Sequence, residues 1–334
     1  MNLTTVREIY RSRETYLDKE VQIGGWVRSV RGSKNFGFIV VSDGSYFETL
    51  QVVYHDTMPN FAEISKLNVG ASIIVKGTLV ATPEAKQPFE IQATEVAVEG
   101  PSASDYPLQK KRHTLEYLRT ISHLRPRTNT FQAVFRVRSL AAYAIHQYFQ
   151  EHDFVYVHTP LITGSDCEGA GEMFQVTTLD LNNVPKTPEG AVDFAQDFFN
   201  KPTNLTVSGQ LNAETYAMAF RNVYTFGPTF RAENSNTTRH AAEFWMIEPE
   251  MAFTHQEESL EVQEQYVAFL VQNVLDHCEY ALDVLGRDKE VLKTYTKLPF
   301  PRITYDDAIE LLKKNGFDDI EWGEDFGSPH ETFI

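Results

Sequence analysis

The segment 230–244, FRAENSNTTRHAAEF, combines two arginines, one histidine and two glutamates between two phenylalanines. Arginine offers a planar fork of donors that suits phosphate oxygens. Phenylalanine offers a face on which a flat ring can stack, and an arginine can cover the other side of that ring. A glutamate can accept a hydrogen bond from an exocyclic amine. The segment is therefore suited to a polyanion that carries an aromatic base, with a solvated hairpin as the alternative.

The charged segment lies between two predicted strands, 222–230 and 243–252, and would form the tip of a hairpin. A helix is predicted over 131–151, where apolar residues recur at helical spacing, followed by a strand over 154–157 that ends near Pro160. The apolar positions of that helix are Val134, Val137, Ala141, Ala144, Ile145 and Tyr148.

Two more helices are predicted after the hairpin. The first covers 254–285 and is opened by Thr254 with Glu257 in a capping-box pattern. The second covers 302–314 and ends at Asn315-Gly316. Residues 178–204, rich in Asn, Pro, Asp and Gly, are typical of a surface insertion.

The first hundred residues predict a small all-β domain. Short strands are expected over 21–30, 36–41, 49–54, 72–80 and 89–98, with a helical stretch over 60–67 before the fourth. This order favours a closed barrel of the OB type, and a β-sandwich is the alternative. Residues 99–112 contain Gly, Pro and Ser and indicate a linker.

Composition narrows the class of protein. A chain of 334 residues with 42% hydrophobic residues predicts two globular domains. The net charge of −16 argues against a protein that coats nucleic acid non-specifically, although it allows a local basic patch. Cys167 and Cys278 lack metal-ligand spacing and are expected to be reduced thiols in a cytoplasmic protein. The polar N-terminus is not typical of a signal peptide, and no apolar run reaches the length of a membrane span.

In this order, the barrel, the helix-and-strand pair and the charged hairpin resemble the class II aminoacyl-tRNA synthetases over the whole 334 residues. The helix over 131–151 with its strand looks like motif 1 of that family, and 230–244 looks like motif 2. An N-terminal OB barrel is similar to that of the aspartate, asparagine and lysine subgroup. The implied fold is α+β, with an anticodon-binding barrel at 1–100, a linker or hinge at 101–130 and a class II catalytic domain at 131–334.

The resemblance implies roles in ATP binding for the hairpin. Arg231 is expected to hold the α-phosphate and the substrate carboxylate, and Glu233 to contact the adenine amine, as the two catalytic residues. Arg239 and His240 occupy positions where the family binds the distal phosphates. Phe244 is expected to stack under adenine.

The resemblance also implies an amino-acid site. Glu168 matches the glutamate that lies over the substrate ammonium, and a Gly-rich turn with a solvent-facing glutamate is the alternative. Ser208, Gln210 and Glu214 belong to the element that contacts the substrate side chain. Aspartyl enzymes have a lysine at the position of Ala213, whereas Glu214 is an acceptor that suits the NH₂ of a carboxamide. The alternative for Glu214 is that it is a negative charge near the N-terminus of a helix, where the helix dipole favours it.

In the barrel, Phe38 and Gln51 match the family's anticodon contacts, a stacking ring and an amide that reads a base edge. Arg28 is assigned to the same anticodon-binding surface, where Arg31 and Lys34 could also contact phosphates. A core position is the alternative for Phe38, because strand alternation places Phe36 on the same side.

The predicted function is activation of asparagine with ATP and transfer to tRNA(Asn), by a homodimer joined through motif 1, with ATP and Mg²⁺ as cofactors. Motif 3 and the Mg²⁺ ligands are not recognisable and are expected beyond residue 334, so no metal ligand is assigned within this chain. This chain alone is expected to bind ATP poorly. A non-discriminating aspartyl enzyme and a non-catalytic tRNA-binding protein are the alternatives.

Overall fold

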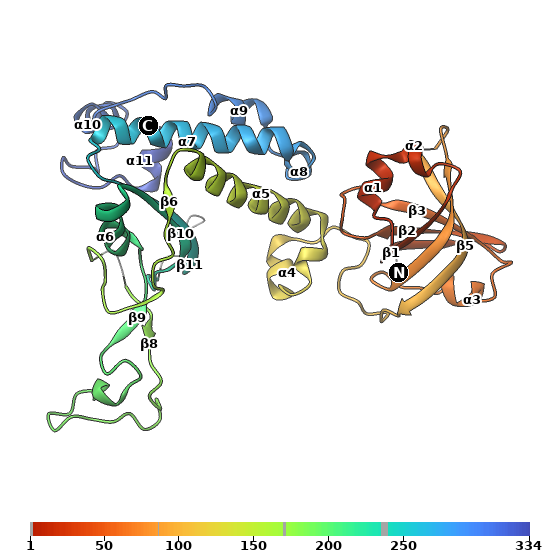
Figure 1. The fold of residues 1–334 in the computed structure, drawn as a ribbon, viewed down its shortest axis with the longest axis horizontal. Helices are drawn as coiled ribbons and strands as arrows, with labels where there is room; N and C mark the ends of the chain where they lie inside the picture. The colour runs from red at the N-terminus through yellow and green to blue at the C-terminus, as the bar shows by residue number, and fades with distance from the viewer. Residues whose placement is uncertain (1–2, 86, 170–171, 235–239) are drawn as a thin grey trace. The chain divides into compact units, whose positions relative to one another are not determined.

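The computed structural model describes residues 3–85, 87–169, 172–234 and 240–334 (Figure 1). The chain divides into two compact units. The first contains residues 1–138 and 278–287, and the second contains residues 139–277 and 288–334.

A closed five-stranded barrel forms most of the first unit, with the order β1-β2-β3-β5-β4. All five predicted strands are confirmed, and the closure excludes the β-sandwich. Alternate side chains point inward and form one core that includes Ile23, Ile39, Val52, Val75 and Ile91. The strands are β1 (Glu20–Gly32), β2 (Phe36–Ser42), β3 (Leu50–His55), β4 (Ser72–Ala81) and β5 (Phe89–Gly100), with α3 (Phe61–Ile64) before β4.

Two short helices that the sequence analysis did not assign precede the barrel, namely α1 (Val6–Arg11) and α2 (Arg13–Tyr16). Helix α1 begins with a capping box between Thr5 and Glu8. Val6 and Ile9 are fully buried in the barrel core. The polar residues of the N-terminal segment are therefore the outer side of an amphipathic turn.

The predicted linker contains short helical elements of its own. These are α4 (Leu115–Thr120) and the 3-10 turn η1 (Arg125–Arg127). Leu108, Leu118 and Leu124 form a small separate core beneath them. Part of this stretch is therefore packed.

In the second unit, a hairpin of β10 (Asn222–Phe230) and β11 (Glu243–Met251) pairs from Asn222–Met251 to Phe230–Glu243. This confirms the hairpin predicted around the charged segment. Strand β6 (Val155–Tyr156) adds to β10 in parallel. The C-terminal part of α5 (Asn129–Glu151) packs through Ile145, Tyr148 and Phe149 against β10 and against α7 (Gln256–His277).

The predicted helix 254–285 is wrong in two respects. It begins at Gln256, because the Glu258 carboxylate accepts the His255 N–H at 3.1 Å, while Glu257 pairs with Arg302 at 2.6 Å. It also ends at His277, and a separate α8 (Glu279–Val284) follows. The capping box on Thr254 is thus replaced by a cap one residue later.

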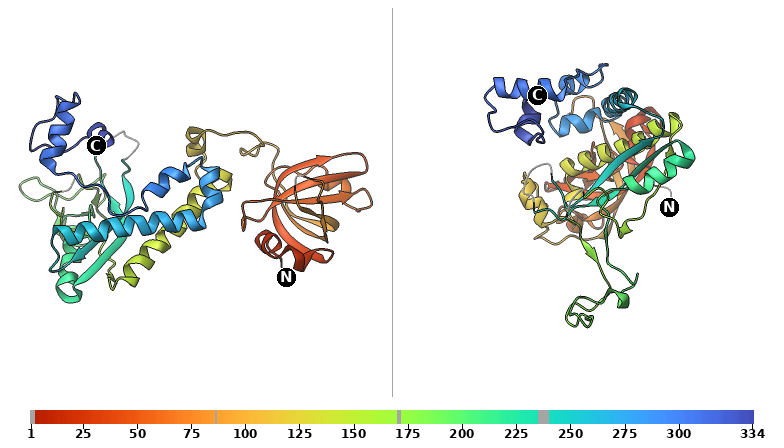
Figure 2. Two further views of the ribbon diagram at one scale, coloured as in Figure 1. Left: turned by 90° about the horizontal axis from the view of Figure 1, so that it is seen from above. Right: turned by 90° about the vertical axis from the view of Figure 1, so that its left-hand side faces the viewer.

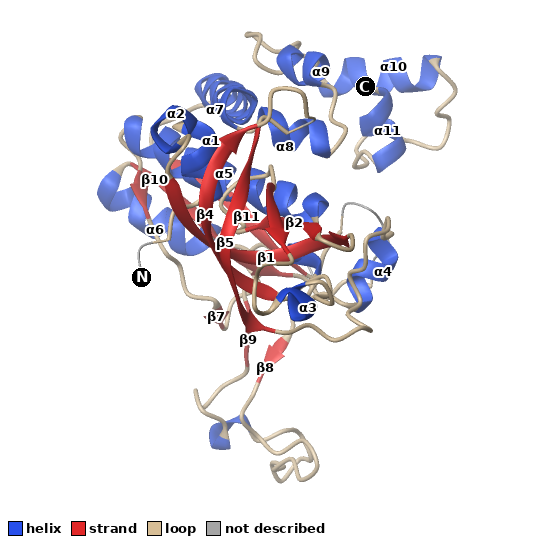
Figure 3. Ribbon diagram, turned by 90° about the vertical axis from the view of Figure 1, so that its right-hand side faces the viewer, coloured by secondary structure: helices blue, strands red, loops and turns tan. Residues whose placement is uncertain are grey.

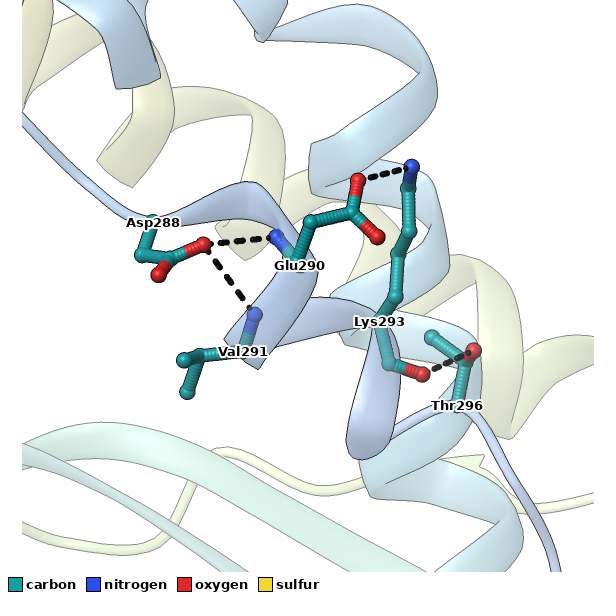
Figure 4. A network of polar contacts seen from close by, with 5 residues as sticks. All are labelled: Asp288, Glu290, Val291, Lys293 and Thr296. Atoms are coloured by element: carbon teal, nitrogen blue, oxygen red, sulfur yellow. Dashed lines mark hydrogen bonds and ion pairs between the residues drawn. The ribbon is translucent and has the colours of Figure 1, made fainter.

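The C-terminal region contains three further helices. Asp288 caps α9 (Lys289–Thr294) by accepting the N–H groups of Glu290 and Val291 (Figure 4). Helix α10 (Tyr305–Lys314) lies within its predicted range, and α11 (Ser328–Phe333) lies where no helix was predicted (Figure 2). Gly327 N–H donates to His330 Nδ1 at 3.0 Å, so a histidine supplies the N-terminal acceptor that the sequence analysis had not considered.

The predicted surface insertion extends from a small sheet of β7 (Ile162–Thr163), β9 (Thr203–Leu205) and β8 (Gln175–Val176), and is mostly loop (Figure 3). Between β8 and β9, it contains the 3-10 turn η2 (Phe194–Gln196) and an isolated bridge between Lys186 and Val192. The Asp197 carboxylate accepts from the Thr177 and Thr178 hydroxyls at 2.6 and 2.8 Å and ties the two ends of the loop together. Helix α6 (Gln210–Phe220) follows β9. Across the described ranges, no helix is long and apolar enough to cross a membrane.

Candidate functional site

Arg231 and Phe244 lie together at the loop end of the β10–β11 hairpin. Arg231 directly follows β10, and its N–H donates to Ala242 O at 3.1 Å. Its guanidinium carbon lies 5.7 Å from the centre of the half-buried Phe244 ring. The Arg231 Nε is buried and has no hydrogen-bond partner among the described residues. A buried donor left unpaired is costly, so this arginine is poised for an anion beside an aromatic surface.

The remaining predicted nucleotide ligands lie in the segment that joins the two strands. Glu233 and His240 are exposed. Arg239 lies outside the described residues. The structure therefore brings Arg231 and Phe244 together and leaves the roles of the other three as predictions.

The predicted amino-acid residues surround the N-terminus of α6. Ser208 Oγ donates to one oxygen of Glu248, a residue of β11. Gly209 N–H and Thr225 Oγ1 donate to the other oxygen at 3.1 and 2.8 Å. A side chain at position 209 would begin 2.6 Å from Thr159 Oγ1 and 3.2 Å from Glu248 Oε2. Glycine is therefore required here, because it lets the backbone approach the carboxylate.

Gln210 links this element to the loop that contains Glu168. Its amide nitrogen donates to Glu214 Oε1 at 3.0 Å, and its amide oxygen lies 3.8 Å from Cys167 Sγ. Glu168 directly follows Cys167 and is exposed. The structure thus connects the Glu168 loop to Glu214 through one glutamine.

Three glutamates lie close enough to Glu250 for their charges to act on it, and we call the four residues the acidic cluster: Glu168, Glu214, Glu248 and Glu250. Burial, followed by the charges of the other three, raises the pKa of Glu250 to about 7. Sequence reasoning missed Glu248 and Glu250. Their spacing of two residues on a predicted strand was the available signal, because it places both side chains on one side of β11. A cluster of carboxylate acceptors suits an ammonium and an amide NH₂.

Ala213 does not face this cluster. It is fully buried against Val157, Ala217 and Val223. The comparison with aspartyl enzymes at this position stays a prediction.

The three predicted anticodon residues divide into two groups. Phe38 and Gln51 lie on the outside of the barrel, and Gln51 Nε2 donates to Glu90 Oε2 at 2.8 Å. Arg28 instead donates to Arg127 O at 2.7 Å and to Asn129 Oδ1 at 3.0 Å, and burial lowers its pKa. Arg31 lies over Phe38 at 5.8 Å. The arginine beside the predicted stacking ring is thus Arg31, while Arg28 holds the linker.

Metal binding has less support than nucleotide binding. No group of three or more His, Cys, Asp or Glu side chains is arranged to hold a metal ion in the part of the chain that the structure describes. Mg²⁺ usually retains water and binds through one or two carboxylates together with substrate phosphates. We therefore assign it no ligand.

Comparison with known proteins agrees with this geometry. Residues 114–333 match the family model of class II tRNA synthetases (D, K and N), and residues 21–99 match that of OB-fold nucleic acid binding domains. The asparagine--tRNA ligases of Clostridium botulinum and Desulfitobacterium hafniense are each 58% identical, over 100% of this chain and 74% of their own length. The asparaginyl-tRNA synthetase of Pyrococcus horikoshii, solved with asparaginyl-adenylate, superposes with a TM-score of 0.87 at 26% identity, over 99% of this chain and 71% of that chain. The chain belongs to the class II tRNA synthetases and, within them, to the asparagine--tRNA ligases.

Proposed function

We propose that this protein activates asparagine with ATP and transfers the asparaginyl group to tRNA(Asn). The observation that supports this choice of amino acid is the acidic cluster, in which the charges of three other glutamates act on Glu250. Asparagine presents an ammonium and an amide NH₂, both donors. The side chain of aspartate would bring another carboxylate close to these glutamates, and the repulsion between like charges disfavours its binding.

The chemistry requires positioning and no protein nucleophile. A carboxylate oxygen of asparagine attacks the α-phosphorus of ATP, the bond from that phosphorus to the bridging oxygen breaks, and pyrophosphate leaves. A hydroxyl of the tRNA then attacks the asparaginyl carbonyl, and AMP leaves. Arg231 is proposed to hold the α-phosphate and the attacking carboxylate, so that its fixed charge stabilises the transition state.

The other hairpin residues complete the proposed nucleotide site. Phe244 stacks under adenine. The Arg231 guanidinium carbon lies 5.7 Å from the centre of the Phe244 ring, so both residues border the same place. Glu233 accepts from the adenine amine, and Arg239 and His240 bind the distal phosphates. Mg²⁺ bound together with these phosphates would supply further positive charge.

The amino-acid site divides between the two ends of the substrate. Glu168 pairs with the ammonium, since a buried ammonium needs a charged partner. Glu214 accepts from the amide NH₂, and Gln210 fixes its carboxylate through the 3.0 Å hydrogen bond. Ser208 donates a hydrogen bond to Glu248 and so orients the carboxylate of Glu248 within the acidic cluster.

We propose three further properties. The protein acts as a homodimer through α5, on which Phe135 and Tyr143 are 42% and 67% exposed. It works in the cytoplasm, in keeping with its two free cysteines. Residues 1–100 bind the anticodon, 101–130 act as a hinge, and 131–334 belong to the catalytic domain.

Amino-acid-dependent ATP–pyrophosphate exchange tests the assignment in the full-length protein. Asparagine should support exchange and aspartate should not. Replacing Glu214 with Gln should raise the KM for asparagine by about 10- to 100-fold, the range for a hydrogen bond to a charged group. Exchange that depends on aspartate and not on asparagine would overturn the proposal.

A further inference from the structure

A cavity of about 1310 Å³ lies between the barrel and the linker, and all of its lining residues belong to the first compact unit. Its walls come mainly from the outside of β1 and β2, from residues 106–118 and from residues 126–132 at the start of α5. Sites for small molecules typically have volumes of roughly 300–1,000 Å³. The cavity therefore has room for a ligand of nucleotide size, and no step of the proposed aminoacylation uses it.

The walls of this cavity are basic, although the net charge of the protein is −16. Glu116 is the one carboxylate among the described lining residues. The positive side chains of the walls form no salt bridge with any residue that the structure describes. They are Arg28, Lys110, Lys111, Arg112 and Arg127. Such a group of cations attracts a ligand that carries several negative charges.

Two of these arginines are held in place by neutral groups. The Arg28 guanidinium donates to Arg127 O at 2.7 Å and to Asn129 Oδ1 at 3.0 Å, and burial lowers its pKa. Arg127 Nη1 donates to the Tyr106 hydroxyl at 3.0 Å. The Tyr106 ring packs on the backbone of Gly70, where an added Cβ would lie 3.1 Å from the ring. Both positive charges are thus fixed at the wall before a ligand binds, and no carboxylate offsets them.

The cavity also offers an aromatic surface. Trp26 lies on the outside of β1 and is 53% exposed, whereas the next residue, Val27, is fully buried in the barrel core. His113 stacks on Tyr117 with ring centroids 5.6 Å apart, and its buried Nε2 has no hydrogen-bond partner among the described residues. A polar group of a ligand would satisfy that nitrogen. An exposed indole close to a group of cations suits a compound that combines a flat ring with phosphates.

We propose that this cavity binds a nucleoside polyphosphate, with the base stacked on Trp26 and the phosphates on Lys110, Lys111 and Arg112. The site is distinct from the ATP site at Arg231, and the inference does not rest on the proposed function. Lysine and arginine are the side chains that bind phosphate oxygens, while an indole face accepts any base. A polyanion without a ring would leave the indole unused, and an apolar compound would leave the cations unused.

Isothermal titration calorimetry of the full-length protein with GTP tests the site, because GTP is not the nucleotide of the proposed reaction. Trp26→Ala should weaken GTP binding by about 5- to 100-fold, the range for losing one stacked base. Trp26→Phe should recover most of that loss, because it keeps a flat ring. Replacing Lys110, Lys111 and Arg112 together with Ala should weaken binding by about 10-fold or more. Lys66→Ala is the matched control, since Lys66 is exposed on the same unit outside the cavity and its loss should leave the affinity unchanged.

Tripolyphosphate separates the contribution of the ring from that of the phosphates. It should bind the unaltered protein at least about fivefold more weakly than GTP, and Trp26→Ala should not alter its affinity. Equal affinities for tripolyphosphate and GTP would contradict stacking on the indole. Absence of GTP binding to the unaltered protein would overturn the whole proposal.

Two further measurements identify where the nucleotide is bound. Arg231→Ala should leave the GTP affinity unchanged, and loss of GTP binding in that variant would place GTP in the catalytic unit and disprove the proposal. The triple variant should also be titrated with an anticodon stem-loop RNA of tRNA(Asn). Weaker RNA binding with an unchanged GTP affinity would assign these cations to an RNA-binding surface and would equally disprove it. Circular dichroism melting of each variant separates loss of binding from loss of fold.

Discussion

The outer surface of β2, β3 and β5, which we call the reading face, and the acidic cluster both contain carboxylates, but the surroundings of these carboxylates differ. On the reading face, Glu90 accepts from the amides of Gln51 and Gln92 at 2.8 and 2.9 Å, so its oxygens already have hydrogen-bond donors. In the cluster, Glu250 is surrounded by three other carboxylates, and its pKa is raised to about 7. The first arrangement is complete without a ligand. The second gathers negative charge, which a substrate ammonium can offset.

Their construction also differs. The reading face comes from three neighbouring strands, so one register fixes every side chain in it. The acidic cluster comes from a loop, the start of α6 and the far strand of a hairpin, so it depends on how separate elements pack. We therefore expect substitutions on the barrel to act locally, and substitutions in the catalytic unit to affect several substrate groups together.

The largest expected effect separates the two regions through Arg231. Arg231→Ala should lower ATP–pyrophosphate exchange by about 100- to 1000-fold, the loss seen when one fixed donor to a developing charge is removed. Binding of the anticodon stem-loop should stay within about twofold, because Arg231 is not on the barrel. Exchange kinetics and RNA titration on the same preparation check both halves.

Arg231→Lys is the informative companion to that variant. A lysine retains the charge but lacks the planar fork, so it should restore only a small part of the exchange. Full recovery would show that charge alone is needed and would contradict the assigned bidentate role. Normal exchange in Arg231→Ala would remove the residue from the mechanism.

A smaller effect is expected from Phe38→Leu on the barrel. Leucine keeps the apolar cover but removes the flat ring, so stem-loop binding should weaken by about 5- to 100-fold. The KM for asparagine in exchange should change far less than the RNA affinity. Equal losses in both measurements would show that the two regions are coupled, and would contradict the local behaviour expected of the reading face.

The barrel was predictable because its strands follow one simple rule. The strands and their order followed from the sequence pattern, whereas alternation left Phe38 either in the core or on the outside. The structure places Phe38 outside and Ile39 in the core. The direction of Arg28 was not predictable, because its partners Arg127 and Asn129 come from about a hundred residues later in the chain.

The catalytic unit was predictable in its motifs and less so in its details. The hairpin around 230–244 followed from two strand patterns, and Arg231 with Phe244 followed from the resemblance. Glu248 and Glu250 were missed because they read as ordinary outward residues of β11 until α6 is placed against them. The start of α7 was misplaced and the whole of α11 was missed, because side-chain caps on His255 and Gly327 outweighed the sequence signals considered.

The smallest predicted effect concerns the proton on Glu250. Its pKa is raised from 4.5 to about 7 in the folded protein, chiefly by burial and then by the charges of Glu214, Glu248 and Glu168. Between these pH values the folded state holds a proton that the unfolded state releases, so the stability contributed by this proton is lost as pH rises towards 7. Glu250→Gln is neutral throughout and should lack this loss.

Urea unfolding of the full-length protein at pH 5 and pH 8 measures the difference. From pH 5 to pH 8, the free energy of unfolding of Glu250→Gln should rise by about 1–2 kcal/mol relative to that of the unaltered protein. This figure allows for the partial exposure of Glu250. Saturating asparagine should reduce that gain, since its ammonium would stabilise the charged carboxylate in the unaltered protein. A parallel pH dependence in the two proteins would contradict an uncompensated cluster and would make this site resemble the self-satisfied Glu90. The contrast between the two regions therefore depends on whether a substrate cation is required to complete one of them.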